Sequence, residues 1–204
     1  MKTLPFVLTA ALTVFLTGCS DSTPAPAEKK AEEKPEPVTG QSALFKMYQV
    51  ARSWAPDAAV LKLTSMHLAD VPDQPGKAGA WEGTFVSQQR STTRIYTWSA
   101  IEMQPNLHKG VFAGSEQSYS SSGPTKAFLI GAVKIDTDAA LKTAKAKAVD
   151  YEKKNPGKPI SFLLEQVAKF ANPEWRVVWG ESLGVSDFSI YVDASTGTYL
   201  ETMH

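Results

Sequence analysis

Residues 188–201, FSIYVDASTGTYLE, contain two short runs of strand-forming residues separated by a turn. Apolar side chains alternate with others through Phe188–Asp193, as in a strand with one buried face. The next residues, Ala194-Ser195-Thr196-Gly197, are of the types that favour tight turns, and 198–201 is predicted to be a last short strand. Because 175–179 is also rich in β-branched and aromatic residues, the end of the chain is predicted to be antiparallel sheet.

A helix is predicted upstream of these strands, over residues 139–154. Asp136-Thr137-Asp138 supplies capping and acidic first-turn residues, and Asn155-Pro156-Gly157 ends the run. Residues 160–170 are apolar, and their pattern leaves strand and helix open.

The first half of the folded chain shows the same order of elements. Ser42 is the expected N-cap of a helix over 43–54, and strands are predicted at 60–68, 81–86 and 92–101. A serine-rich run, 115–123, is predicted to be a loop that joins the halves. We therefore expect an α+β fold built as a tandem of two helix-plus-antiparallel-sheet units, at 41–125 and 126–204, with chance similarity of two meanders as the alternative.

Three stretches of the second half resemble PepSY or PepSY-like domains: KIDTDAA at 134–140, WRV at 175–177 and YVDASTG at 191–197. The resemblance covers residues 134–204, and residues 42–101 only by pattern. It implies a helix against a small antiparallel sheet, and a binding module that binds or restrains peptidases and supplies no catalytic residues.

The N-terminus carries the signs of export. Lys2 precedes an apolar run at 4–16, which predicts a signal peptide over 1–18. Leu16-Thr17-Gly18-Cys19 resembles the lipobox of bacterial lipoproteins, which implies that Cys19 carries diacylglycerol and palmitate and anchors the chain in the membrane. Cys19 is the only cysteine, so no disulfide can form within the chain; the alternative is a free cysteine in an ordinary signal peptide.

Residues 19–40 are predicted to be a disordered linker. Prolines alternate there with alanine, glutamate and lysine, and such a segment buries too little apolar surface to fold. Ser20, where inner-membrane lipoproteins of many Gram-negative bacteria have aspartate, favours the inner leaflet of the outer membrane, facing the periplasm.

The composition argues against several classes of function. Lys+Arg and Asp+Glu both number 21, so there is no excess of basic charge for nucleic acid. The three histidines lie far apart and there is no Gly-x-Ser-x-Gly motif, so we expect no metal, no cofactor and no enzymatic activity.

Three tryptophans in predicted strands, Trp81, Trp175 and Trp179, are the candidate surface for a peptide or ligand, although packing between helix and sheet would use the same residues. The sequence thus predicts a lipid-anchored, non-enzymatic protein of the bacterial envelope that binds a protein or peptide. The alternative is a carrier or sensor for a small apolar ligand.

Overall fold

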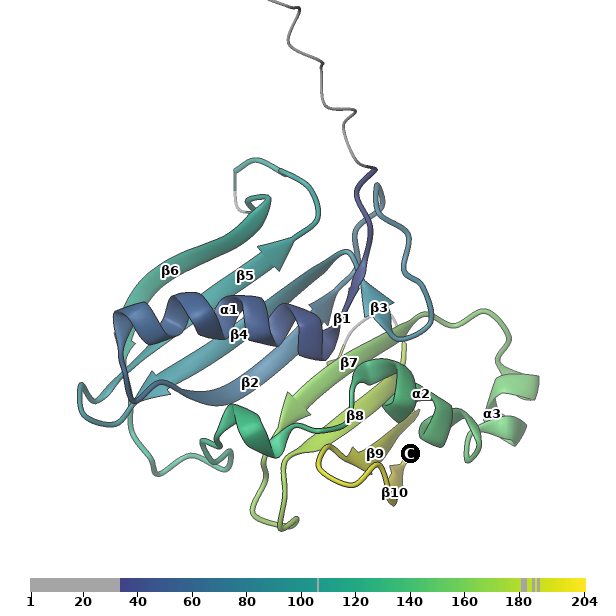
Figure 1. Cartoon of the computed structure of the whole chain (residues 1–204). Coiled ribbons are helices and arrows are strands. Elements are labelled where there is room, and N and C mark those ends of the chain that lie inside the picture. The colour runs from purple at the N-terminus through teal and green to yellow at the C-terminus, as the bar shows by residue number, and fades with distance from the viewer. Residues whose placement is uncertain (1–33, 106, 181–182, 185, 187) are drawn as a thin grey trace, which may run out of the picture. The chain divides into compact units, whose positions relative to one another are not determined.

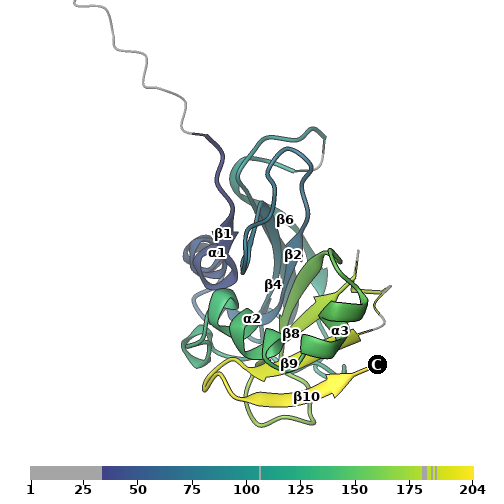
Figure 2. The same cartoon turned by 90° about the vertical axis from the view of Figure 1, so that its right-hand side faces the viewer.

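The computed structural model describes residues 34–105, 107–180, 183–184, 186 and 188–204. The predicted signal peptide, Cys19 and the linker up to residue 33 lie outside the described residues. Eight antiparallel strands form one sheet in the order β10-β9-β8-β7-β2-β4-β5-β6, and helices α1 and α2 pack on the same face of it (Figures 1 and 2). The expected α+β class is confirmed, with few helices and one large antiparallel sheet.

The first half of the folded chain consists of a helix followed by four strands of the sheet. These elements are α1 (Gly40–Trp54), β2 (Ala59–Met66), β4 (Ala80–Ser87), β5 (Thr92–Ser99) and β6 (Gly110–Ser118). Two short strands, β1 (Val38–Thr39) and β3 (Lys77–Ala78), pair with each other beside the start of α1.

The second half repeats this order. After the short helix η1 (Ile130–Ala132) come α2 (Thr137–Lys145), α3 (Val149–Lys154), β7 (Ile160–Glu165), β8 (Glu174–Trp179), β9 (Phe188–Asp193) and β10 (Tyr199–Met203). The ambiguous segment at 160–170 therefore begins as a strand.

The two halves share one sheet because their first strands pair with each other. β2 and β7 run antiparallel, with Lys62, Leu63 and Thr64 opposite Glu165, Leu164 and Leu163. In the first half, β2, β4, β5 and β6 lie side by side in that order, and in the second half β7, β8, β9 and β10 do so. Each half is therefore a four-stranded meander. Neither half has a sheet of its own.

The helix ends differ from those expected. α1 begins at Gly40, and its N-cap is Thr39, whose hydroxyl accepts a hydrogen bond from the Ser42 N–H (3.4 Å). The helix predicted over 139–154 is divided into α2 and α3. The break turns α3 so that the Tyr151 ring stacks on Phe188 (ring centroids 4.0 Å apart), a tertiary contact that outweighs the helix preference of alanine and lysine.

The sequence predicted that the serine-rich run at 115–123 is a loop, but part of it is a strand. Residues 115–118 belong to β6, which pairs with β5 along the edge of the sheet. Small and polar side chains are tolerated there because several β6 residues are exposed.

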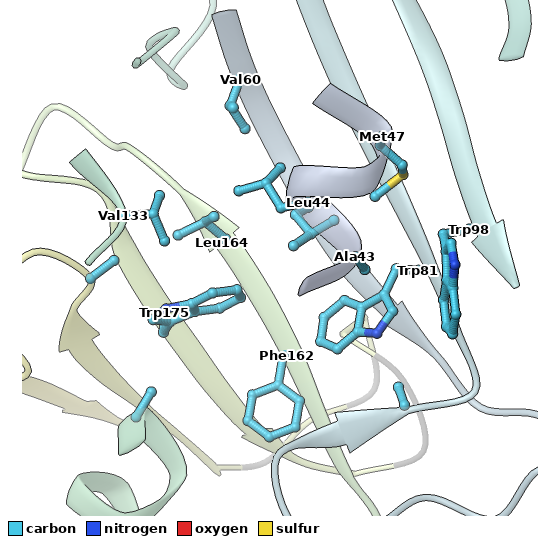
Figure 3. Packing of buried hydrophobic residues seen from close by; sticks show 14 of the residues in the cluster. Ala43, Leu44, Met47, Val60, Trp81, Trp98, Val133, Phe162, Leu164 and Trp175 are labelled. Atoms are coloured by element: carbon cyan, nitrogen blue, oxygen red, sulfur yellow. The ribbon is translucent and has the colours of Figure 1, made fainter. Parts of the chain in front are cut away.

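The core lies between the helices and the sheet. Figure 3 shows Leu44 of α1 among Trp81, Phe162 and Trp175, all of them buried. The first residues of α1 and α2 also meet in this region, since the Gly40 N–H donates to the Thr137 hydroxyl (2.9 Å).

Candidate functional site

The three tryptophans proposed as a binding surface are core residues. Trp81 and Trp175 are fully buried and Trp179 is 1% exposed. Their indole N–H groups donate to the Val38 carbonyl (3.1 Å), the Ile135 carbonyl (2.8 Å) and the Glu152 carboxylate (3.1 Å), respectively. These tryptophans therefore pack between the helices and the sheet. A binding surface must lie elsewhere.

The outer edge of the sheet is one such place. β6 is the last strand in the sheet order, so among the described residues its second edge pairs with no strand (Figure 1). Its sequence, GVFAGSEQS, contains no lysine, arginine or proline, the residues that commonly protect free edges. The ladder is interrupted once: Arg94 pairs with Glu116 and Tyr96 with Ala113, which leaves an extra residue on β6.

A shallow hollow of about 210 Å³ lies beside this edge. Ile95, Thr97, Phe112, Gly114, Ser115 and Gln117 line it. Phe112 is 44% exposed, and a side chain at position 114 would approach the Ile95 carbonyl oxygen to 3.2 Å. Glycine therefore leaves room for the hollow. The Gly114 carbonyl accepts from Arg94 Nε (2.7 Å), while no described strand pairs with the second edge of β6 beside the apolar wall.

A second cluster joins a serine, a histidine and an aspartate from distant parts of the chain. His67 follows β2, Asp73 lies in the segment before β3, and Ser161 belongs to β7. Nδ1 of His67 bonds to the Asp73 carboxylate, and Nε2 lies 2.7 Å from the Ser161 hydroxyl. The Asp73 bond raises the pKa of His67 above 6.5, against the opposing effect of burial.

The three side chains are connected in the same order as in the Ser-His-Asp hydrolases. The serine of this cluster, unlike the nucleophile of such an enzyme, is buried. When His67 carries its proton on Nδ1, Nε2 can accept the Ser161 proton, as in those enzymes. Ser161, however, is only 3% exposed, so a substrate carbonyl cannot reach its oxygen without displacing neighbouring side chains. The observed arrangement ties the segment that carries Asp73 to β7.

A buried carboxyl group lies on the face of the sheet opposite α2. Glu174 is fully buried, and it pairs across the sheet with Glu165 on one side and Asp193 on the other. Desolvation, and then the charges of these two carboxylates, raise the pKa of Glu174 to about 8, although the Val167 N–H donates to it (3.2 Å). The protonated, uncharged form of Glu174 therefore predominates at pH 7.

The pKa of Asp193 is lowered, whereas that of Glu174 is raised. Burial would raise the pKa of Asp193, but hydrogen bonds from Asn172, Ser195 and Thr196 lower it below its usual value. Asp193 therefore stays ionised beside the neutral Glu174, and its carboxylate holds the turn before β10.

Within the part of the chain that the structure describes, no three histidine, cysteine or acidic side chains are placed to hold a metal ion. His108 pairs with Glu102 (2.7 Å), and the His204 ring packs on Phe188, so the histidines stay apart. No described helix is long and apolar enough to cross a membrane.

No family model matches this chain. No curated protein matches it either. Among solved structures, the chain is similar to a candidate lipoprotein (CD1622) of Clostridium difficile 630, with a TM-score of 0.45 and 9% identity, over 78% of this chain and 91% of that one. At this level of identity the function of one protein does not transfer to the other.

Neither the β6 edge nor the histidine cluster was identified from the sequence. Ser161 lies 94 positions from His67, and no local motif links them. The short apolar run Val111-Phe112-Ala113 was a signal for β6, but the glycines at 110 and 114 weaken it.

Proposed function

We propose that this protein is a lipid-anchored, non-enzymatic protein of the bacterial envelope that binds an extended segment of another envelope protein along β6. The observation that carries the proposal is a sheet edge of nine residues that pairs with no described strand and lies beside an apolar hollow. Addition of a strand to such an edge satisfies backbone groups, while a neighbouring pocket selects a side chain.

The features of β6 fit this mode of binding. Its unpaired N–H and C=O groups would bond to the backbone of the partner, with a net gain of roughly 0.5–1.5 kcal/mol for each bond. Phe112 and Ile95 would bury an apolar partner side chain, since both line the hollow. The only acidic or basic residue of β6, Glu116, accepts a hydrogen bond from the Trp54 indole (2.5 Å), so its side chain already has a partner within the chain.

The sequence supports the proposed location. A signal peptide over 1–18 and lipidation of Cys19 by diacylglycerol and palmitate would tether the folded part, and Ser20 favours the inner leaflet of the outer membrane, facing the periplasm. In the same proposal, the two helix-plus-meander halves are PepSY-like units that arose by duplication.

A crosslinking experiment tests the binding mode. A photo-reactive amino acid at Phe112 is compared in living bacteria with the same probe at Val50, which is 40% exposed on α1. We expect a discrete adduct between position 112 and another envelope protein, and none from position 50. Equal adducts from both positions, or none from position 112, would contradict the proposal.

A charged edge gives the matched control. Ser115→Lys adds a positive charge to β6 and should reduce the adduct, whereas Ser122→Lys changes an exposed residue beyond the strand and should leave it unchanged. Equal yields in the two variants would argue against strand addition.

The anchor is tested separately. Radioactive palmitate should label the wild-type protein and not Cys19→Ala. If neither form is labelled, the proposed anchor is wrong, while binding along β6 keeps its own test.

A further inference from the structure

The hollow beside β6 lies on the face of the sheet opposite α1 and α2. Lys46 of α1 lies over the Trp98 ring (4.9 Å), so Trp98 faces the helices. Because side chains alternate along a strand, Thr97 and Ile95 project from the other face, where Thr97 lies across from Phe112. The hollow is therefore bounded by β5 on one side and by the outer edge of β6 on the other.

Gly114 sets the size of this hollow. A methyl group at position 114 would lie 3.2 Å from the Ile95 carbonyl oxygen, so any side chain there would crowd β5 and take up part of the space. The hollow of about 210 Å³ is smaller than the pockets of about 300 Å³ or more that hold small-molecule ligands, but larger than a cavity of about 150 Å³ that holds benzene. It fits one aromatic side chain of a bound segment better than a free ligand.

A strand added to β6 would place one of its side chains over Gly114. The Ala100 N–H donates to the Gly79 carbonyl (2.9 Å), so Ala100 turns its N–H and C=O groups toward β4. These directions alternate along a strand, so Tyr96 also turns its groups toward β4, and Ala113, which pairs with Tyr96, turns its own toward the outer edge. A residue that bonds to Ala113 has a neighbour across from Gly114, and the side chain of that neighbour lies on the face that carries the hollow.

The exposed wall of the hollow is aromatic. Phe112 is 44% exposed, although the His108 ring packs on it (ring centroids 4.4 Å apart). A residue across from Gly114 is diagonal to Phe112, a separation that aromatic side chains span. Two aromatic rings attract each other beyond the effect of the area that they bury, and a ring covers the bare backbone of a glycine at a sheet edge. An aromatic side chain therefore gains more in this place than an aliphatic one.

We propose that the partner segment carries an aromatic side chain across from Gly114, and that its ring fills the hollow against Phe112 and Ile95. This inference rests on the proposed addition of a strand to β6, and it names the chemistry by which that site selects its partner. The competing occupant is a second copy of the chain, which would offer its own Phe112.

The test uses the chain from Ser20 onward, because residues 34–204 hold every described helix and strand in one unit. The probes are nine-residue peptides, KTVTXTVTK, blocked at both ends, in which X is phenylalanine, leucine or glycine. Titrations are followed by the NMR signal of the Gly114 amide. We expect the phenylalanine peptide to bind at least fivefold more tightly than the leucine peptide and at least tenfold more tightly than the glycine peptide.

Equal binding of the three peptides would mean that β6 accepts a strand but that the hollow does not select an aromatic ring, so only this inference would be wrong. If none of the peptides binds, strand addition to β6 is itself wrong, and the inference falls with it. A Gly114 signal that changes with protein concentration alone, together with dimers in sedimentation, would assign the hollow to a second copy and would also overturn the proposal.

Two substitutions of phenylalanine locate the bound ring. Phe112→Ala removes the aromatic wall and should reduce the preference for phenylalanine over leucine to less than twofold. Phe45→Ala, at a position of α1 that is 46% exposed, should leave this preference unchanged. Equal effects of the two substitutions would overturn the proposal.

Gly114→Ala narrows the hollow without removing the strand. It should weaken binding of the phenylalanine peptide about tenfold, because the ring loses its space. Binding of the glycine peptide should change less than twofold, which shows that β6 still accepts a strand. An equal loss for both peptides would mean that the substitution acts on strand pairing, and it would contradict the placement of the ring.

Discussion

The backbone N–H of Gly40 donates a hydrogen bond of 2.9 Å to the hydroxyl of Thr137, and this bond joins the first residue of α1 to the first residue of α2. The same hydroxyl donates to the Gly76 carbonyl, so one threonine connects three segments. Around it, the tryptophan of the second strand of each meander donates to a carbonyl just before the helix of its own half: Trp81 to Val38, and Trp175 to Ile135.

Gly40→Ala should destabilise the protein by about 1–3 kcal/mol, as overpacking of a core does. The new methyl group would lie 2.6 Å from the Trp175 ring and 2.8 Å from Thr137 Cγ2. Urea denaturation measures the effect. Gly123→Ala is the control, because nothing lies within 4 Å of a methyl group there, and equal stability of the two variants would show that the contact is not restrictive.

Thr137→Val keeps the shape of the side chain but removes the hydrogen bonds of the hydroxyl with the Gly40 N–H and the Gly76 carbonyl, and a longer one to the Asp136 carboxylate (3.3 Å). It leaves the buried Gly40 N–H and the Gly76 carbonyl without this partner, so we expect a loss of about 1–3 kcal/mol. Thr137→Ser retains the hydroxyl and should recover most of the lost stability. If the serine variant is no more stable than the valine variant, packing rather than hydrogen bonding explains the effect.

Because the pKa of Glu174 is raised, the free energy of unfolding should depend on pH. Its pKa is about 8 in the folded protein and near 4.5 in the unfolded chain, so the folded state binds more protons between these values. The contribution of Glu174 is therefore complete below about pH 4.5, and it is lost as the pH rises through 8. Glu174→Gln should remove about 2–4 kcal/mol of this decline, measured by urea denaturation from pH 5 to 9. The exposed Glu36→Gln variant should keep the wild-type slope, and a Glu174→Gln curve with that slope would refute the assignment.

His67 should titrate above the usual histidine range because of Asp73. Its stabilising contribution is complete below about pH 6.5 and is lost as the pH rises through the folded pKa. In NMR titrations, Asp73→Asn should lower the pKa of His67, while Asp70→Asn, outside this pair, should not. An unchanged His67 titration in Asp73→Asn would show that the carboxylate does not act on the imidazole.

Ser161 should not react with a fluorophosphonate probe, since it is buried despite its bond to His67. Mass spectrometry of the treated protein measures the modification, with Ser161→Ala as the reference. Labelling of the wild type that disappears in this variant would instead identify a serine hydrolase and would contradict the non-enzymatic proposal.

Local pattern was sufficient for much of the fold. Aromatic and β-branched residues marked β4, β5, β8 and β9. Asp136, one of the three predicted capping and first-turn residues, is the N-cap of α2, which begins two residues before the predicted start at 139. These signals depend on neighbours in the sequence and on one buried face, which a single sequence contains.

Long-range pairing decided the rest. The joining of the halves through β2 and β7 depends on residues about a hundred positions apart, and no local pattern shows it. The tryptophans illustrate the same limit: a strand predicts alternation, but which face is covered depends on where α1 and α2 pack. The histidine cluster was missed for this reason, because His67, Asp73 and Ser161 meet only after the two meanders have joined.

The central seam between β2 and β7 has a kinetic consequence. Each meander forms from contacts between successive strands, whereas at the seam the Ser65 hydroxyl accepts from the Phe162 N–H, 97 positions away. Closing so long a loop costs more entropy than closing a hairpin, and contacts of this range slow folding. The seam should therefore form last, and until it does each half exposes the inner edge of its first strand. In that state, the β2 edge of one copy can pair with the β7 edge of another. Refolding at high protein concentration should therefore favour domain-swapped dimers over monomers.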